Sequence, residues 1–323
     1  MSLAERYRDR LPLTAATPIV TLGEGGTPLL EAPRLSASLG LEVWLKWEGQ
    51  NPTGSFKDRG MTIAISKALE EGARAVICAS TGNTAASAAA YAARAGLPAL
   101  VLQPAGAVAI GKLAQARALG ARVLEVRGSF DDALAAAREL AARGTHVLVN
   151  SLNPYRLEGQ KTAAFEILEQ LGGPPDVLAL PYGGGGNTRA YAMGFEEAAA
   201  LPRIVAVEAR KRAETAASAI RIADPAHAAE VAGAIERSGG RVVTVSDEAI
   251  LDAWRALAQD EGVFCEPASA AGVAGLAHAG LAPGTRVVCV ITGHGLKDPE
   301  TAARLTPPPV AVDPDPDAIA ALA

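Results

Sequence analysis

Short apolar runs alternate with longer runs of helical spacing along most of the chain. The apolar runs predict strands, and the runs between them predict helices. We expect strands at residues 75–79, 99–102, 122–126, 146–149, 176–180, 203–207, 241–245 and 286–291. We expect helices at residues 83–95, 110–119, 130–143 after an N-cap at Ser129, 157–171, 187–200, 247–261 after an N-cap at Ser246, and from Pro267 onward.

Strand–helix alternation of this kind predicts an α/β protein built from right-handed βαβ units, with parallel sheets covered on both faces. There are too many units for one sheet of typical size. We therefore expect two doubly wound parallel-sheet domains, one from residues 52–149 and one from residues 1–51 with 150–323. The proline-rich stretch 306–317 predicts an extended surface tail, neither helix nor central strand.

Composition narrows the class of protein. The 323 residues are 49% hydrophobic and carry a net charge of -5, which favours a large core and argues against nucleic-acid binding. The three cysteines are too scattered for a disulfide framework or a metal site, so reduced, buried thiols are expected. Neither a membrane span nor a signal-peptide core is recognisable, and we expect a cytoplasmic protein that binds neither membrane nor nucleic acid.

The loop at residues 51–60 places Lys57 where a helix is expected to begin near Asp58. The positive end of the helix dipole and loss of solvent both disfavour the ammonium form, and a lysine with a lowered pKa is an amine nucleophile toward carbonyls. The alternative is a solvated lysine paired with Asp58 or Glu24, which is the commoner situation for an arbitrary lysine.

Three further loops follow predicted strands, where open parallel sheets bind ligands. Residues 80–84 offer hydroxyl groups and free N–H groups at a helix N-terminus, a site for a carboxylate or phosphate, although simple capping is the alternative. The run Gly183–Gly186 before Asn187 and Thr188 lets the backbone approach an anion. The loop 292–298 is polar and glycine-rich, and we interpret its His294 as structural.

Other enzyme classes fit these loops poorly. The glycine run lacks the G-x-G-x-x-G spacing of a dinucleotide site, which lowers that hypothesis without excluding it. The nucleotide P-loop, the zinc motif H-E-x-x-H and the nucleophile elbow G-x-S-x-G are all absent, and no metal site is expected. A non-catalytic binding module would not need a lysine loop, an anion loop and a glycine loop together. Pyridoxal phosphate needs all of these parts.

Several segments carry a family resemblance over nearly the whole chain. They are Gly25–Leu29 (GGTPL), NPTGSFKDRG at 51–60, ASTGNTAASAAAYAARAG at 79–96, NSLNPYRLEGQK at 150–161, AIRI at 219–222, FCEPASAA at 264–271 and TGHGLKD at 292–298. The sequence resembles the threonine synthase family of fold-type-II pyridoxal-phosphate enzymes, a group that also includes tryptophan synthase β chains and serine/threonine dehydratases. The resemblance implies that residues 1–51 and 150–323 form a large cofactor-binding domain, with 52–149 as a smaller mobile domain.

The resemblance also implies roles for individual residues. Lys57 would link covalently to the cofactor and then carry protons, and Asn83 would contact the phenolic oxygen. Thr292 would face the ring nitrogen. The remaining cofactor residues would cradle the phosphate: Gly183, Gly184, Gly185, Gly186, Asn187 and Thr188. The substrate residues would hold carboxylate and phosphate groups: Ser80, Thr81, Thr84, Asn150, Ser151 and Arg156.

The implied reaction is loss of phosphate from O-phospho-L-homoserine followed by addition of water, giving L-threonine. A homodimer is implied as well. One departure bears on substrate choice: the phosphate loop reads Gly-Gly-Gly-Gly-Asn after Tyr182, where comparable family members tend to read Gly-Asn-Ala-Gly-Asn. A related enzyme for another phosphorylated or phosphonate amino acid, or a threonine/serine dehydratase, is therefore the alternative.

Overall fold

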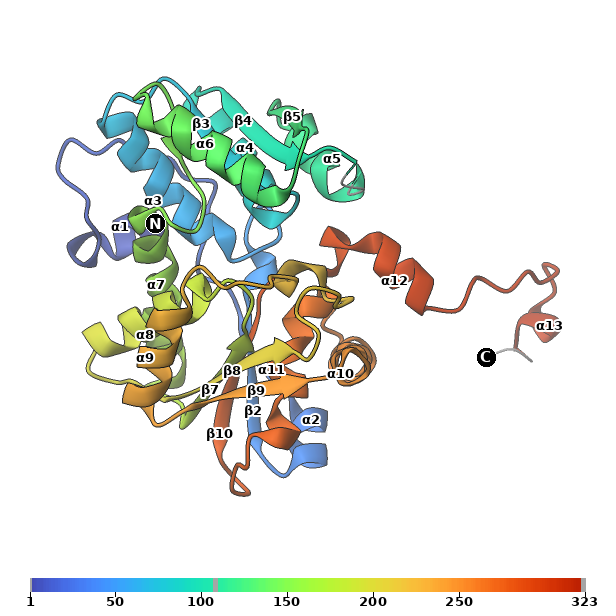
Figure 1. Ribbon diagram of the computed structural model, residues 1–323. Helices are drawn as coiled ribbons and strands as arrows, with labels where there is room; N and C mark the ends of the chain where they lie inside the picture. The colour runs from blue at the N-terminus through green and yellow to red at the C-terminus, as the bar shows by residue number, and fades with distance from the viewer. Residues whose placement is uncertain (1, 107–109, 321–323) are drawn as a thin grey trace.

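A computed structural model describes residues 2–106 and 110–320, which fold around two separate sheets (Figure 1). In the described residues, one sheet has six strands in the order β1-β2-β10-β7-β8-β9, and the other has four in the order β5-β4-β3-β6. The six-stranded sheet consists of β1 (Leu29–Glu31), β2 (Glu42–Trp47), β7 (Val177–Pro181), β8 (Arg203–Ala209), β9 (Arg241–Val245) and β10 (Arg286–Ile291). The four-stranded sheet consists of β3 (Val76–Ala79), β4 (Ala99–Pro104), β5 (Arg122–Val126) and β6 (Val147–Leu148).

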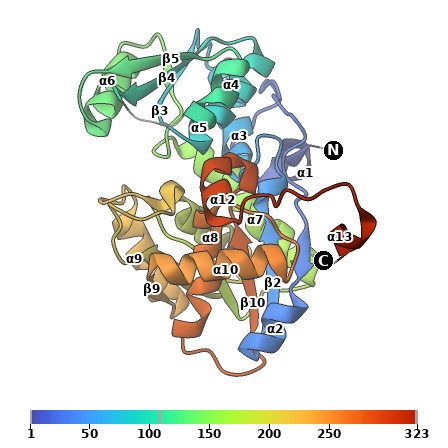
Figure 2. The same cartoon turned by 90° about the vertical axis from the view of Figure 1, so that its right-hand side faces the viewer.

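Among the strands of the described residues, every pair is parallel except β1 with β2, which is antiparallel. Strand β10 is central in its sheet: Val288 lies opposite Trp44 of β2 on one side and Leu178 of β7 on the other. Because parallel strands end at the same edge, the loops after β2, β7 and β10 meet there. This edge faces the four-stranded sheet in both views (Figures 1 and 2).

Helices cover both faces of each sheet. The α-helices are α1 (Leu3–Arg6), α2 (Pro33–Leu39), α3 (Lys57–Glu70), α4 (Asn83–Ala95), α5 (Ile110–Ala118), α6 (Phe130–Ala142), α7 (Pro154–Leu171), α8 (Gly186–Glu197), α9 (Ala228–Ser238), α10 (Asp247–Gln259), α11 (Ala271–Ala274), α12 (Pro299–Leu305) and α13 (Pro316–Ala320). Short 3-10 helices are η1 (Arg8–Arg10), η2 (Glu48–Gln50), η3 (Ser218–Ile220), η4 (Pro267–Ala270), η5 (Leu276–His278) and η6 (Gly295–Lys297).

The two faces of each sheet belong to different hydrophobic clusters. In β7, Val177 and Ala179 pack with residues of α10 and α11, whereas Leu178 and Leu180 pack with α7 and α8. Successive side chains of a strand point to opposite faces, so a strand covered on both sides must be apolar throughout. The smaller sheet follows the same rule: its two clusters join it to α3, α4 and α5 on one face and to α6 on the other.

The predicted fold class is confirmed: the protein is α/β with parallel sheets. Most predicted elements are present with ends shifted by a few residues, and Ser129 and Ser246 cap α6 and α10 as expected. The helix expected at 157 starts instead at Pro154, because Asn153 accepts from the Tyr155 N–H and proline is tolerated in the first turn. The helix expected from Pro267 is a short 3-10 turn, η4, followed by α11.

Two expectations need larger correction. The tail was expected to contain no helix, yet α13 begins at Pro316, which is compatible with the first turn of a helix. The N-terminal elements α1, β1, α2 and β2 and the later helices α9 and α12 were not predicted, and β1 breaks the all-parallel pattern. In Figures 1 and 2 the chain after α12 runs outward to α13.

None of the helices in residues 2–106 and 110–320 is both long and apolar enough to cross a membrane. Cys78, Cys265 and Cys289 are free and buried.

Candidate active site

A cavity of about 1250 Å³ lies between the two sheets and is lined by loops from both. The structure brings most of the sequence-predicted residues to its wall: Lys57, Ser80, Thr81, Asn83, Thr84, Asn150, Ser151, Gly183, Gly184, Gly185, Gly186, Asn187 and Thr292. Thr188 and Arg156 do not line it, and both are buried close behind lining residues. Their neighbours in sequence, Asn187 and Leu157, are part of the wall.

Lys57 is the first residue of α3 and is half-buried in the cavity wall. Burial, with a smaller effect from the nearby Arg156 guanidinium, lowers the pKa of Lys57 to about 7, while the Glu266 carboxylate acts in the opposite direction. The expectation of a lowered pKa is confirmed. A large fraction of the amine is therefore neutral near pH 7, as a nucleophile toward an aldehyde requires.

The carboxylates that could have paired with Lys57 are engaged elsewhere. Asp58 accepts from the Thr53 hydroxyl at 2.6 Å and from the Ser87 hydroxyl at 2.6 Å. Glu24 accepts from the Tyr91 hydroxyl at 2.7 Å. The Lys57 Nζ lies 4.3 Å from the centroid of the Phe56 ring. The surface ion pair considered as an alternative is thus not formed with either acid.

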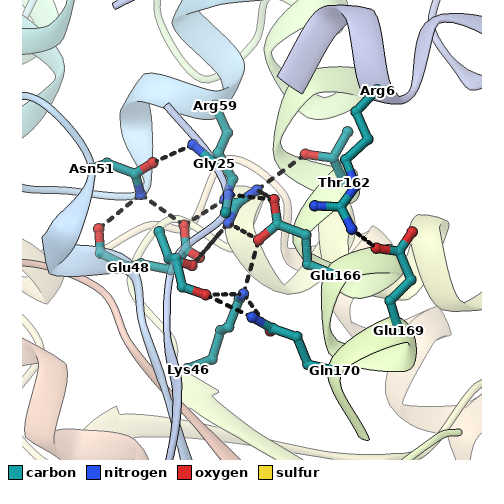
Figure 3. Close-up of polar contacts among 12 residues, drawn as sticks. Arg6, Gly25, Lys46, Glu48, Asn51, Arg59, Thr162, Glu166, Glu169 and Gln170 are labelled. Carbon is teal, nitrogen blue, oxygen red and sulfur yellow. Dashed lines mark hydrogen bonds and ion pairs between the residues drawn. The ribbon is translucent and has the colours of Figure 1, made fainter. Parts of the chain in front are cut away.

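The first turn of α3 is anchored by a buried ionic network that sequence reasoning missed (Figure 3). Arg59 is 1% exposed and donates to Glu48 Oε2 at 2.6 Å and to Glu166 Oε2 at 2.6 Å. Lys46 on β2 donates to the same Glu166 oxygen at 2.8 Å. Burial alone would raise the pKa of Glu166, but Arg59 and Lys46 hold it below its usual range. The network ties α3 to β2 and α7 through Arg59, which lies two residues after Lys57.

Residues 80–84 form the turn into α4 and its first two residues, and the N-cap residue Gly82 has no side chain to cap the helix. Ser80 accepts from the Gly82 N–H at 3.2 Å. Asn83 does not point freely into the cavity: its amide donates to Glu266 at 2.9 and 3.2 Å. Glu266 is 3% exposed, lines the cavity and was not among the predicted site residues, although it lies within the FCEPASAA segment.

The glycine loop after β7 is shaped by close contacts. Gly185 has φ +85°, and a Cβ there would lie 2.8 Å from Val231, so only glycine fits. Arg212 donates to the Gly183 carbonyl at 3.2 Å and stacks on Tyr182 with 4.3 Å between guanidinium carbon and ring centroid. A Cβ at Gly184 would lie 3.4 Å from the Ile222 Cδ1.

Thr292 follows β10 and faces the cavity with 6% of its surface exposed. Its hydroxyl oxygen lies 2.9 Å from the hydroxyl oxygen of the fully buried Ser269. Ser269 also accepts from the Gly293 N–H at 2.9 Å. These contacts fix the Thr292 side chain at the end of the strand.

His294 lies in the same loop. It accepts a hydrogen bond from the Leu296 N–H at 3.1 Å, consistent with the structural role expected for it.

Asn150 and Arg156 lie around the start of α7. Asn150 forms a pair of 2.9 Å hydrogen bonds with the backbone of Ala79, one as donor and one as acceptor, at the end of β3. Arg156 is fully buried and donates to the Val149 carbonyl at 3.1 Å, but its Nε and one terminal nitrogen have no partner among the described residues. Burial lowers the pKa of Arg156 to about 10.

The residues present fit a phosphorylated pyridine cofactor. The Asn187 amide nitrogen and the Thr188 hydroxyl are buried and, within the described part of the chain, lack hydrogen-bond partners. Such groups cost free energy unless a ligand satisfies them. They stand at the N-terminus of α8, directly after the glycine loop, which is a favourable place for a phosphate. A lysine with a lowered pKa and a neutral hydroxyl, Thr292, line the same cavity.

Comparisons with known proteins agree with this geometry. Residues 20–293 match the family described as "Pyridoxal-phosphate dependent enzyme". Threonine synthase from Halalkalibacterium halodurans is 51% identical over 320 residues, which cover 93% of this chain and 90% of the relative. Threonine synthase from Synechocystis is 53% identical, covering 94% and 85% of the two chains. The solved structure of a threonine deaminase from T.th. is 30% identical with a TM-score of 0.71, covering 83% of this chain and 92% of that one.

The cavity chemistry, the match to the cofactor family and the identity to relatives agree with one another. The predicted cofactor and the predicted family are both confirmed. Pyridoxal phosphate is the cofactor of this enzyme, and the chain belongs to the threonine synthase family of pyridoxal-phosphate dependent enzymes.

Proposed function

We propose that this enzyme is a lyase that releases phosphate from O-phospho-L-homoserine and adds water to give L-threonine. The observation that carries the proposal is a second set of anion-binding groups, separate from the glycine loop. Asn150 and Ser151 line the cavity, and the buried Arg156 guanidinium behind them has two nitrogens without partners among the described residues. A dehydratase substrate carries no phosphate and would leave these donors unused, whereas a phosphorylated substrate would satisfy them.

Lys57 has the central role in this proposal. When bound, the cofactor supplies an electron sink for negative charge that develops on the substrate. The neutral Lys57 amine would accept the proton from the substrate Cα and return protons to the neighbouring carbons. A lysine with a pKa of about 7 is suited to both directions of transfer at neutral pH. The network around Arg59 supports this role by holding the first turn of α3 in place.

The other cavity residues would bind and orient. Gly183–Gly186, Asn187 and Thr188 would hold the cofactor phosphate, with donors at the start of α8. Thr292 would donate to the ring nitrogen, and Asn83, held by Glu266, would contact the phenolic oxygen. Ser80, Thr81 and Thr84 at the start of α4 would bind the substrate carboxylate.

Water must stay away from the site until phosphate has left, so the cavity has to close during the reaction. We therefore propose that residues 52–149 act as a smaller mobile domain, whose sheet β3 to β6 moves against residues 1–51 and 150–323 while the first turn of α3 stays anchored to β2 and α7 by Arg59. This division is supported by the sheets, since β3 to β6 lie within the smaller segment and the six-stranded sheet lies outside it. Such closure would also bring the substrate phosphate toward Arg156, which lies behind the cavity wall.

We further propose that the enzyme works as a homodimer in the cytoplasm. The free, buried thiols of Cys78, Cys265 and Cys289 are compatible with a reducing compartment. The dimer follows from the family resemblance. Light scattering of the purified protein tests it, because a mass of one 32.9 kDa chain would contradict a dimer.

A comparison of three substrates tests the proposed function against its alternatives. The cofactor-loaded enzyme is given O-phosphohomoserine, L-threonine or L-serine in separate assays. We expect phosphate release from the first and no ammonia release of comparable rate from the other two. Faster ammonia release from threonine or serine would establish a dehydratase. No turnover of any of the three, with the cofactor bound, would indicate a paralogue for another phosphorylated or phosphonate amino acid.

A further inference from the structure

A buried histidine joins the glycine loop to the segment that carries Ser151. His227 precedes α9 and is 2% exposed. Its backbone N–H donates to the Gly184 carbonyl at 3.1 Å. Its ring Nε2 lies 3.1 Å from the Ser151 carbonyl oxygen. One residue therefore contacts both segments that the proposed function assigns to phosphate binding.

The contacts of the imidazole ring place a hydrogen on Nε2. A carbonyl oxygen can only accept, so Nε2 must carry the hydrogen that is shared with Ser151. On the other side of the ring, Nδ1 lies 3.3 Å from a terminal nitrogen of Arg189 and 3.5 Å from Glu230 Oε1. Arg189 is itself held by Glu230 at 2.8 Å. This surface pair thus orients the ring so that its donor faces Ser151.

The ring also fits closely against the glycine loop. A Cβ at Gly186 would lie 3.4 Å from His227 Cδ2 and 3.8 Å from the Ser151 Cβ. A Cβ at Gly185 would lie 3.1 Å from the His227 Cβ. The imidazole therefore occupies the space between the glycine loop and Ser151. Across a trans peptide the C=O and N–H point in opposite directions, so the bond to Gly184 turns the Gly185 N–H away from His227.

We propose that His227 is a positioning residue that fixes the distance between the two phosphate sites by bonding the glycine loop with its backbone and Ser151 with its side chain. The inference rests on the proposed function for the placement of the substrate phosphate at Ser151. His227 does not line the cavity and touches neither phosphate in this arrangement. Its effect is to hold Ser151 and its neighbour Leu152 at the wall in the orientation that receives the substrate.

Two substitutions separate the side-chain donor from the bulk of the residue. In His227→Gln the amide nitrogen can take the place of Nε2 and donate to Ser151. In His227→Asn the amide is shorter, reaches only the position of Nδ1 and loses that bond. Both variants keep the backbone bond to Gly184. We expect both to retain the visible absorbance of bound cofactor, because the glycine loop is intact in each.

The first measurement is hydrogen exchange of the segment 148–153 in the cofactor-loaded enzyme without substrate. Loss of one buried hydrogen bond should speed exchange of this segment about tenfold in His227→Asn and leave His227→Gln within about threefold of the parent. The second measurement is turnover of O-phosphohomoserine, where we expect the KM to rise about tenfold in His227→Asn with kcat within about threefold, and rescue in His227→Gln.

The outcomes distinguish this inference from the proposed function. If the parent enzyme does not turn over O-phosphohomoserine, the proposed function fails, and the exchange comparison alone decides whether His227 positions Ser151. If the parent is active and the two variants match each other in both exchange and KM, the inference is overturned. Loss of cofactor from His227→Asn with unchanged exchange at 148–153 would overturn it too, since the histidine would then act on the glycine loop alone.

Discussion

The Asn83 side-chain amide donates to the Glu266 carboxylate at 2.9 and 3.2 Å, across the cavity that holds Lys57. Asn83 begins α4 beside the four-stranded sheet, and Glu266 precedes η4 beside the six-stranded sheet. The pair therefore links the two halves of the site. Glu266 also raises the pKa of Lys57, against the stronger lowering effects of burial and Arg156. One carboxylate thus affects both the orientation of Asn83 and the charge of Lys57.

Attachment of cofactor should depend on pH through Lys57. Its pKa is lowered from 10.5 to about 7, so the neutral amine, which is the reactive form, increases as the pH rises through about 7. We expect the rate at which the cofactor-free protein takes up pyridoxal phosphate to rise between about pH 6 and 8 and then level off, measured by visible absorbance. Lys57→Ala should develop no such absorbance. A rate in the parent that keeps rising to about pH 10 would contradict the burial effect.

Glu266→Gln should move that pH dependence in a defined direction. Removing the negative charge takes away an interaction that favours the ammonium form of Lys57, so the pKa of Lys57 falls further. We expect the midpoint of the uptake profile to shift to lower pH by about half a unit to one unit. Glu300→Gln is a matched control. Glu300 also lines the cavity, but the pKa of Lys57 is set by burial, Arg156 and Glu266. A midpoint that rises in Glu266→Gln would exclude this interaction.

Arg156 should matter for the phosphorylated substrate much more than for the cofactor. Bonds between a guanidinium and a phosphate are charge-assisted, so we expect Arg156→Met to raise the KM for O-phosphohomoserine by about 10- to 100-fold. The absorbance of bound cofactor should be retained. Arg138→Met, at another position of the cavity wall, is the control and should change the KM by less than about threefold. An unchanged KM in a folded Arg156→Met enzyme would remove Arg156 from the substrate site.

The network around Arg59 should contribute to stability as well as to positioning. Arg59→Met leaves the buried carboxylates Glu48 and Glu166 without their main partner, and breaking a buried ion pair typically costs about 3–5 kcal/mol. The free energy of unfolding in urea measures this loss. Arg6→Met breaks the half-exposed pair with Glu169 and should cost no more than about 1 kcal/mol. A loss of no more than about 1 kcal/mol in Arg59→Met would contradict the stabilising role of the buried network.

Local sequence patterns predicted the repeating elements of the fold well. Strands β5, β9 and β10 and helix α4 have the predicted bounds, because apolar runs or alanine-rich spacing are bounded by clear turn signals. The N-terminal strand β1 was missed because only Leu29–Glu31 forms it, too short for a pattern. Its antiparallel pairing with β2, the next strand along the chain, was missed as well, because no strand was predicted at residues 42–47.

Site residues at a strand end or a helix start were predictable from the sequence. Site residues that are placed by packing were harder to predict. Lys57, the glycine loop and Thr292 each come directly at a helix start or strand end, and all line the cavity. Glu266, Ser269 and His227 were missed as site residues, since a buried carboxylate, hydroxyl or imidazole carries no local pattern. Each is brought near the cavity by contacts with residues distant in the sequence, such as Glu266 with Asn83 and His227 with Ser151.

The conversion of O-phosphohomoserine to threonine can be followed by quantifying both products of a reaction run in water enriched in the heavy isotope of oxygen. The purified, cofactor-loaded enzyme is given O-phosphohomoserine, and phosphate and threonine are quantified together. We expect equal amounts of the two, with oxygen from the solvent in the threonine hydroxyl group and the original ester oxygen retained by the phosphate. A protein that binds the cofactor yet forms neither product would contradict the proposed function.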